Sequence, residues 1–182
     1  MSDQGSVPPL GVLDAVAAEI EAHIAMDGWD QAPQLFALVP TTVMAADPTT
    51  APLLGLSPAT QIPPDSLTPV AQEPLPDKPL DEALAGIEWP EPVIGCALAQ
   101  EIVVLPPAAE TELPGGDGDL AAATAHPDRR EARLVVAVVN DGRQSCVLRL
   151  RGDADAGDAG DEIAFGADLA PNLAAALRGT LS

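Results

Sequence analysis

The chain has 182 residues, of which 28 are acidic and 8 are basic, and its formal net charge is −20. Clustered lysines and arginines are needed to displace counterions from a phosphate backbone, so this composition argues against DNA or RNA as the principal ligand. It argues equally against an anionic membrane surface. Because 47% of the residues are hydrophobic, the chain can fill a core, and we expect a single domain over residues 1–182.

Aromatic residues make up 2% of the chain, and tyrosine is absent. We therefore expect a core of aliphatic side chains and little capacity to bind ligands by stacking. The first residues carry neither a positive charge nor an apolar run, so we expect no signal peptide and a cytoplasmic protein. Cys96 and Cys146 lie in apolar segments and are expected to be reduced core residues. No apolar run reaches the roughly 18 residues that a transmembrane helix needs.

The first predicted element is a helix over residues 10–27. Its apolar residues recur at the spacing of one helical face, and Gly28 follows where a left-handed residue would end the helix. Residues 34–39 form an apolar run between prolines, which predicts a buried strand that could extend to Met44. A helix is the competing interpretation of this run. The apolar face of the first helix comprises Leu13, Val16, Ala17, Ile20 and Ile24.

A proline-rich arm follows over residues 47–79. Its prolines exclude long regular structure, and its scattered leucines favour packing along the surface over disorder. Short helical turns remain possible near 53–56 and 58–61. Residues 80–87 then predict a short amphipathic helix, which ends before a Trp-Pro pair because a residue that precedes proline is pushed out of the α region.

Predicted strands dominate the second half of the chain. Residues 93–105 are a long apolar run, which is typical of a central strand. Residues 133–139 and 143–151 flank an Asn-Asp-Gly turn and predict a β-hairpin. An acidic loop over residues 152–162 then leads to a C-terminal helix at 168–181.

Together these elements predict an α+β fold. Strands that form hairpins, with helices at both ends of the chain, are typical of a two-layer sandwich. We expect an antiparallel sheet of about four strands that carries the N- and C-terminal helices on one face.

The acidic loop raises the question of cation binding. A calcium-binding EF-hand loop needs oxygen ligands at positions 1, 3, 5 and 12 and glycine at position 6. Counted from Asp153, positions 5, 6 and 12 are Gly157, Asp158 and Ala164, so the spacing fails. A solvated acidic loop is the preferred interpretation, and Asp153, Asp155 and Asp158 remain the candidate metal ligands. We expect no cofactor.

A second cluster of titratable residues offers candidates for catalysis. His126 beside Asp128 could act as a general base, and Arg129 could hold an anion. Neighbouring residues of an extended chain point in opposite directions, however, so a polar entry to a strand is the preferred interpretation. The sequence has neither a nucleophile elbow, nor a phosphate-binding loop, nor the spacing of a zinc site.

Arginines on the predicted hairpin are the candidate residues for partner binding. Arg149 and Arg151 alternate with apolar residues, which predicts one apolar face and one cationic, solvated face. With Arg143 they form a small basic stripe. This stripe could receive an acidic peptide or pair with the acidic loop of the same chain, and the second option is favoured because the loop is tethered beside it.

Several segments resemble a family of uncharacterised actinobacterial proteins, and the resemblance spans nearly the whole chain. It implies a cytosolic source and transfers no activity, cofactor or catalytic residue. The segments that carry it are Gly28-Trp29-Asp30, Leu35–Val39, Trp89-Pro90, Gly95–Leu98, Val103–Pro107, His126–Glu131 and Asp168–Pro171.

The first functional hypothesis is a non-enzymatic binding or chaperone-like module for a protein partner, because no catalytic constellation is evident and the surface is acidic. Modules of this size hold partner segments on a sheet edge or in a groove. The alternative is a small enzyme with a site around His126, Asp128 and Arg129. The chain is expected to be a monomer or a homodimer, and in one version of the dimer the edge of the hairpin pairs with its copy.

Overall fold

The computed structural model describes residues 11–57, 59–104, 130–152 and 162–181. Six strands form one antiparallel sheet in the order β2-β1-β3-β4-β5-β6, so the predicted α+β class with an antiparallel sheet is confirmed. The strands are β1 (Gln34–Pro40), β2 (Leu67–Ala71), β3 (Gly95–Val104), β4 (Arg130–Val139), β5 (Gln144–Leu150) and β6 (Glu162–Gly166). The helices are α1 (Val12–Ala25), α2 (Thr41–Ala46), the short 3-10 helix η1 (Ala51–Leu54), α3 (Leu80–Ala85) and α6 (Pro171–Gly179).

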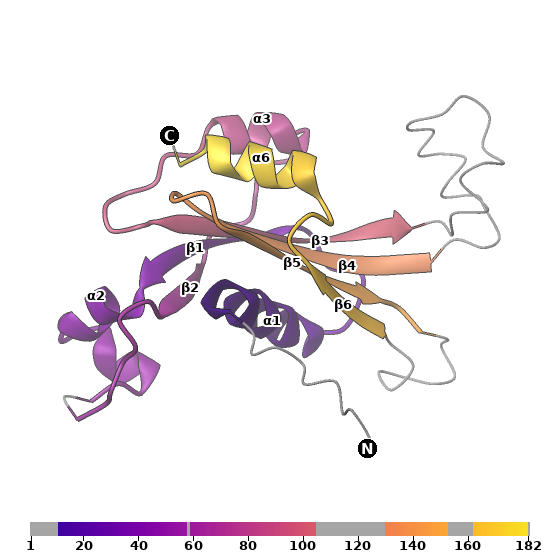
Figure 1. Ribbon diagram of the computed structural model, residues 1–182. Helices are drawn as coiled ribbons and strands as arrows, with labels where there is room; N and C mark the ends of the chain where they lie inside the picture. Colours follow the sequence, from indigo (N-terminus) through magenta and orange to yellow (C-terminus); the bar gives the residue numbers. More distant parts are fainter. Residues whose placement is uncertain (1–10, 58, 105–129, 153–161, 182) are drawn as a thin grey trace, which may run out of the picture.

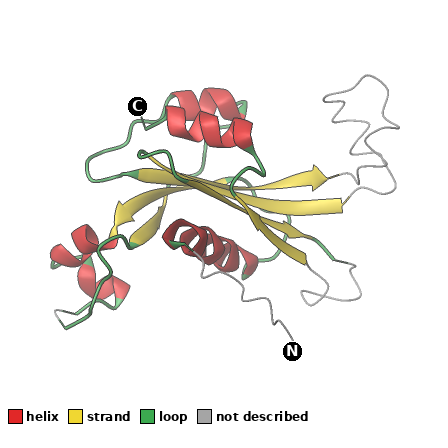
Figure 2. Cartoon of the chain, in the orientation of Figure 1, coloured by secondary structure: helices red, strands yellow, loops and turns green. Residues whose placement is uncertain are grey.

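The helices cover both faces of the sheet (Figures 1 and 2). Helix α1 packs on one face, against β4 and β5, whereas α3 and α6 lie together on the other face. The prediction that the N- and C-terminal helices share one face is therefore wrong, and the arrangement has three layers. The reason is visible in β4, where both sets of alternating side chains are apolar, so that each face of the sheet needs a cover.

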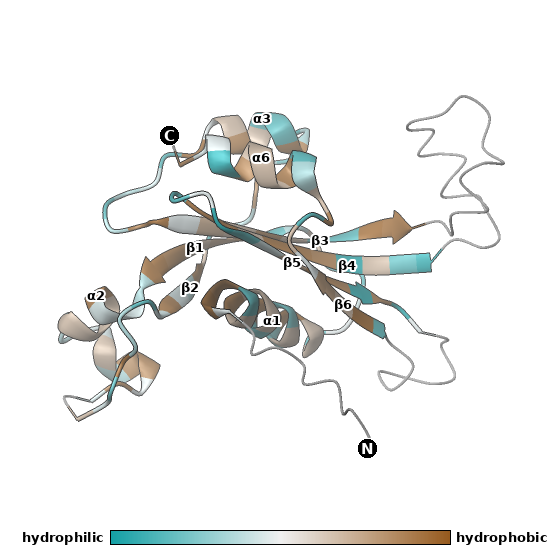
Figure 3. Ribbon diagram, in the orientation of Figure 1, coloured by the Kyte–Doolittle hydropathy of each residue, from teal (hydrophilic) through white to brown (hydrophobic). Residues whose placement is uncertain are grey.

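Each face has its own apolar core. On the α1 face, β4 contributes Val135, Ala137 and Val139, which pack against the apolar stripe of the helix. On the opposite face, β4 contributes Leu134, Val136 and Val138. The hydropathy colouring shows brown over much of the strands, whereas α1, α3 and α6 each mix brown with pale or teal residues (Figure 3). Residues that complete the second core include Leu35, Leu84, Cys96, Leu98, Cys146, Ala174 and Leu177.

The sheet has six strands rather than the predicted four because both edge strands lack a clear signal in the sequence. Strand β2 lies inside the proline-rich arm and contains Pro69. Proline is tolerated there because one side of an edge strand needs no hydrogen bonds. Strand β6 follows the acidic loop and has exposed side chains on both of its faces, so it lacks the alternation that marks a half-buried strand.

The first predicted strand ends earlier than the extended version of the prediction. Strand β1 stops at Pro40, and Thr41 begins helix α2, so the extension to Met44 is wrong. The strand interpretation of residues 34–39 is confirmed over the competing helix. Helix η1 occupies part of the arm where short helical turns were expected.

The β-hairpin is confirmed as β4 and β5. Gly142 in its turn has φ +97°, a conformation that costs glycine little. The outer side of β5 pairs with β6, with Val147 opposite Phe165. The hairpin therefore presents no free edge, and a dimer through the hairpin edge is ruled out by the fold. Among the described helices, none has both the length and the apolar character needed to cross a bilayer.

Candidate functional site

A groove of about 590 Å³ opens where the end of the proline-rich arm passes α3. One wall is the segment that runs from β2 to α3, and the other wall is the segment that follows α3. We call this the Trp89 groove. Its lining residues are Leu35, Gln72, Glu73, Pro74, Leu75, Pro76, Lys78, Glu82, Ala83, Gly86, Ile87, Glu88, Trp89 and Pro90.

The floor of the Trp89 groove is apolar. Leu35 and Ala83 are buried, and Leu75, Ile87 and Trp89 are half-buried against the same core. An apolar floor that stays partly open to water gains free energy when a ligand covers it. The floor therefore supplies affinity for an apolar group.

The rim of the groove is acidic. Glu73, Glu82 and Glu88 are exposed at its edges, and Lys78 is the one cation among the lining residues. Within the described part of the chain, none of these three carboxylates forms an ion pair. The rim thus presents unneutralised negative charge around an apolar floor, an arrangement that favours a cationic ligand.

Trp89 is held in place by the C-terminal helix. Its indole Nε1 donates a hydrogen bond of 2.9 Å to Thr180 Oγ1, and that hydroxyl donates one of 2.6 Å to the Leu177 carbonyl. The polar end of the indole is therefore satisfied inside the protein. Its apolar ring is left to form part of the groove wall.

A second hollow of about 290 Å³ lies on the other side of the arm. Leu75 lines both this hollow and the Trp89 groove. The arm between residues 74 and 78 therefore crosses the surface as a strap with space on both sides. Prolines at 74 and 76 stiffen this strap, because each fixes its own φ angle.

A different candidate is the polar cluster under the C-terminal end of α1. Glu21 on α1 and Arg133 on β4 have side chains that are 3% and 2% exposed. Arg149 on β5 donates to both carboxylate oxygens of Glu21, over 2.5 Å from Nε and 2.9 Å from Nη2. Arg133 Nη1 donates to the same carboxylate over 3.3 Å. One buried anion therefore lies between two arginines.

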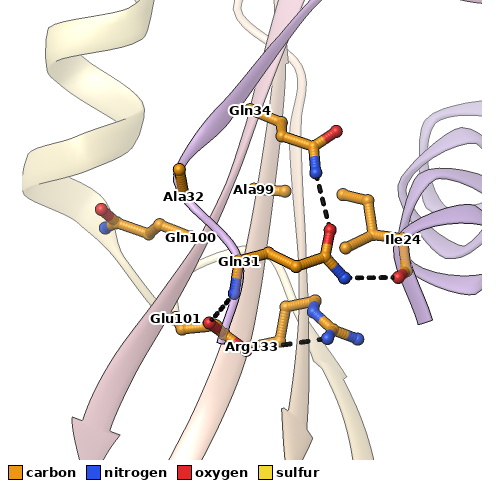
Figure 4. Close-up of a pocket in the computed structure, with 8 residues that line it drawn as sticks. All are labelled: Ile24, Gln31, Ala32, Gln34, Ala99, Gln100, Glu101 and Arg133. Atoms are coloured by element: carbon orange, nitrogen blue, oxygen red, sulfur yellow. Dashed lines mark hydrogen bonds and ion pairs between the residues drawn. The ribbon is translucent and has the colours of Figure 1, made fainter. Parts of the chain in front are cut away.

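The turn after α1 bonds to this part of the sheet through Glu101 on β3. Glu101 accepts a hydrogen bond of 2.8 Å from the backbone N–H of Asp30. It accepts another of 2.7 Å from the backbone N–H of Gln31, which Figure 4 shows beside Arg133. The Gln31 side chain donates to the Ile24 carbonyl over 2.9 Å. The Trp29 ring lies 4.6 Å from the Arg133 guanidinium carbon, a distance at which a cation is attracted to the ring.

This polar cluster is suited to holding the fold together. The cavity between its side chains has a volume of about 10 Å³, which is about the size needed for one water molecule. Arg133 Nε is buried and has no hydrogen-bond partner. The arginines are neutralised by Glu21 and Glu101, so the cluster offers no net charge to an external ligand. The Trp89 groove is therefore the better candidate site.

The structure places the three hairpin arginines apart. Arg149 lies under α1 with a side chain 15% exposed, so the predicted cationic face is covered by a helix rather than solvated. Arg143 pairs with Asp141 over 2.8 Å. Arg151 pairs with Glu131 and approaches Asp30 within 3.9 Å. These partners lie within the same chain. Residues 153–161 of the acidic loop lie outside the described residues, so the pairing of the stripe with that loop stays a prediction.

The remaining predicted site residues lie outside the described residues. These are His126, Asp128 and Arg129, and also Asp153, Asp155 and Asp158. In the described ranges, no group of three or more histidines, cysteines or carboxylates is close enough to hold a metal ion.

Both cysteines are buried free thiols on the α6 face. The Cys96 thiol lies 3.6 Å from the Leu177 carbonyl oxygen and 3.6 Å from Thr180 Oγ1. Burial raises the pKa of Cys96 to about 11, and burial also raises the pKa of Cys146. A high pKa keeps a thiol protonated and unreactive at neutral pH, so both residues behave as core hydrophobes, as their apolar segments predict.

Sequence reasoning missed the residues that form both sites. The sequence could have indicated Glu21 and Arg133, because both are charged residues at positions where the pattern predicts a side chain that faces the core. Glu21 follows Ala17 by one helical turn on the apolar stripe, and Arg133 precedes the apolar run of β4. The groove left no comparable signal, because its walls come from segments that meet only in the folded chain.

Comparison with known proteins places the chain in one family. A family profile described as PPA1309-like protein matches residues 13–182. The chain belongs to this family. The match confirms the resemblance to a family over nearly the whole chain, and the actinobacterial source stays a prediction. No curated protein and no solved structure matches the chain.

Proposed function

We propose that the protein is a non-enzymatic binding module that holds an extended, basic segment of a protein partner in the Trp89 groove. The observation that carries this proposal is the combination of an apolar floor with an acidic rim. Trp89 and Ile87 supply apolar surface, and Glu73, Glu82 and Glu88 supply charge. Such a site fits a segment in which apolar residues alternate with lysine or arginine.

Charge favours a basic partner over other ligands. The chain carries a net charge of −20, which repels nucleic acids and other polyanions at a distance. The same field attracts a basic segment and speeds its encounter with the groove. The carboxylates lie on both walls of the groove, so they also determine where the basic side chains of the bound segment are placed along it.

The size of the groove suits part of a peptide chain. Sites that enclose ligands usually range from about 300 to 1,000 Å³, and the volume of about 590 Å³ falls within this range. An extended chain rises about 3.3 Å per residue, so a few residues fill the groove. Prolines in both walls limit the rearrangement that binding would require.

The test is a titration with three labelled peptides of about twelve residues, which is longer than the few residues that fill the groove and so allows more than one alignment. One alternates leucine with lysine, one leucine with glutamate, and one serine with lysine. Fluorescence anisotropy measures binding. We expect the leucine–lysine peptide to bind with a Kd of about 1–100 µM, and to bind more weakly as salt is added. The other two peptides should bind at least about tenfold more weakly, because each lacks one of the two required contacts.

A matched pair of variants tests the location. The triple variant E73Q/E82Q/E88Q removes three charges from the rim, and the control E19Q/D27N/D65N removes three exposed charges elsewhere. We expect the first to weaken binding by about tenfold and the second to change it by less than about threefold, because nearby charges act more strongly than screened distant ones. Equal losses in the two variants, or no binding of the leucine–lysine peptide, would refute the proposal.

A further inference from the structure

The two edges of the sheet differ in how they are protected. Strand β2 carries Pro69 in its middle, opposite Leu38 of β1. Proline, lysine and short length are the usual devices that prevent an edge strand from pairing with another chain. Strand β6 is as short as β2, with five residues, but contains neither proline nor lysine. Within the described part of the chain, no segment pairs with its outer side.

Strand β6 also exposes two large apolar side chains. Ile163 is 48% exposed and Phe165 is 46% exposed. They lie opposite Arg149 and Val147 of β5. Val147 packs in the core on the α1 side, so both side chains project on the α1 face of the sheet. An open ladder with apolar side chains beside it is a surface suited to β-strand addition.

We propose that β6 pairs antiparallel with β6 of a second copy of this chain, about a two-fold axis at Ala164. The six-stranded sheets of the two copies then form one continuous sheet. Strand addition across a two-fold axis keeps the two α1 faces on the same side. This inference is independent of the Trp89 groove, which lies on the opposite face beside α3.

The sequence of β6 complements itself in this register. With Ala164 opposite its own copy, Ile163 of each chain lies beside Phe165 of the other. Pairs of a β-branched and an aromatic residue are among the favourable cross-strand neighbours. Glu162 lies opposite Gly166, so no like charges face each other within the paired strands. These features select a second copy as the occupant.

The overall charge opposes this association. Each copy carries −20, and the repulsion between copies weakens as salt screens it. We therefore expect the dimer dissociation constant to fall as sodium chloride is raised, which is the reverse of the salt dependence expected for the basic peptide.

Sedimentation equilibrium of the whole chain measures the association, over about 1–500 µM protein. We expect a monomer–dimer equilibrium that Phe165→Lys weakens by about tenfold or more, because the substitution acts twice in a symmetric dimer. The control Leu53→Lys changes a more exposed apolar residue, 82% exposed, on η1, and should leave the equilibrium unchanged. A monomer at every concentration, or a dimer that Phe165→Lys leaves intact, would overturn the proposal.

Crosslinking tests the register without relying on affinity. In Ala164→Cys the new thiols of two copies face each other, so a short bismaleimide should give a covalent dimer. The native cysteines are buried and should not react. The control Ala46→Cys places an exposed thiol on α2 and should remain monomeric. Failure of Ala164→Cys to crosslink, or equal crosslinking of both variants, would exclude this two-fold axis.

Discussion

At the scale of single residues, the buried carboxylate of Glu21 is central to stability, because it neutralises the charges of both Arg149 and Arg133. Removing one partner from a buried ion pair typically costs about 3–5 kcal/mol, since the remaining charge is left without compensation. We therefore expect Glu21→Ala to lower the free energy of unfolding by about that amount, measured by urea denaturation. The control Glu19→Ala lies on the exposed side of the same helix and should change it by less than about 0.5 kcal/mol. A loss below about 1 kcal/mol for Glu21→Ala would contradict this role.

Cys96 makes stability depend on alkaline pH. Because burial raises the pKa of its thiol to about 11 from the reference value of 9.0, the folded state favours the protonated form. Its contribution is complete below about pH 9 and is lost as the pH rises toward 11. Cys96→Ala should therefore flatten the decline of unfolding free energy in this window, by about 2 kcal/mol at pH 11. If wild type and Cys96→Ala decline in parallel, the thiol is not the titrating group.

At the scale of elements, Gly95 shows why the central strands pair closely. A Cβ atom at this position would lie 2.5 Å from the Val138 carbonyl oxygen and 2.7 Å from Val139 Cγ1. Backbone cannot move aside without breaking the pairing of β3 with β4. We expect Gly95→Ala to destabilise the protein by about 2–4 kcal/mol in thermal or urea unfolding.

Gly179 in α6 is the matched control for this prediction. A Cβ atom there would meet nothing within 4 Å, and alanine has the higher helix propensity. Gly179→Ala should therefore leave stability unchanged or raise it by up to about 1 kcal/mol. Equal behaviour of the two glycine variants would show that the close approach at Gly95 has no energetic consequence.

The elements that could be predicted from the sequence are those with a strong hydrophobic period. Helix α1, strands β3, β4 and β5 and helix α6 combine a clear pattern with recognisable ends, such as Gly142 in the hairpin turn. The edge strands β2 and β6 could not be predicted, because their position is fixed by pairing with a neighbour rather than by burial. The apolar run of β4 indicates that both faces of the sheet are covered, but the sequence does not show which helix covers which face.

The candidate site was less accessible from the sequence than the fold. Trp89 and the leucines of the arm were visible as apolar residues, but nothing in the sequence indicated that Leu75 and Ile87 would line the same groove. The prediction of a solvated cationic face on the hairpin was wrong for a related reason. Alternation places Arg149 on the face opposite its apolar neighbours in β5, but only the folded structure shows that α1 covers this face.

At the scale of the whole molecule, surplus negative charge is the dominant property. Repulsion within a chain of net charge −20 destabilises the folded state. Raising the ionic strength from about 0.01 M to 0.15 M shortens the Debye length from about 30 Å to about 8 Å. We expect the thermal midpoint Tm to rise by about 3–8 °C, or about 1–2 kcal/mol, when measured by calorimetry. A fall in Tm over this range would mean that attractive pairs outweigh the repulsion.

The central claim is that the Trp89 groove receives a basic segment, and nuclear magnetic resonance tests its location most directly. The ¹⁵N-labelled protein is titrated with the leucine–lysine peptide while the amide and indole N–H signals are followed. We expect the shifts to concentrate in residues 72–78 and 86–89, and to include the indole N–H of Trp89. Shifts concentrated on β6 or α2, or spread evenly over the acidic surface, would contradict the claim.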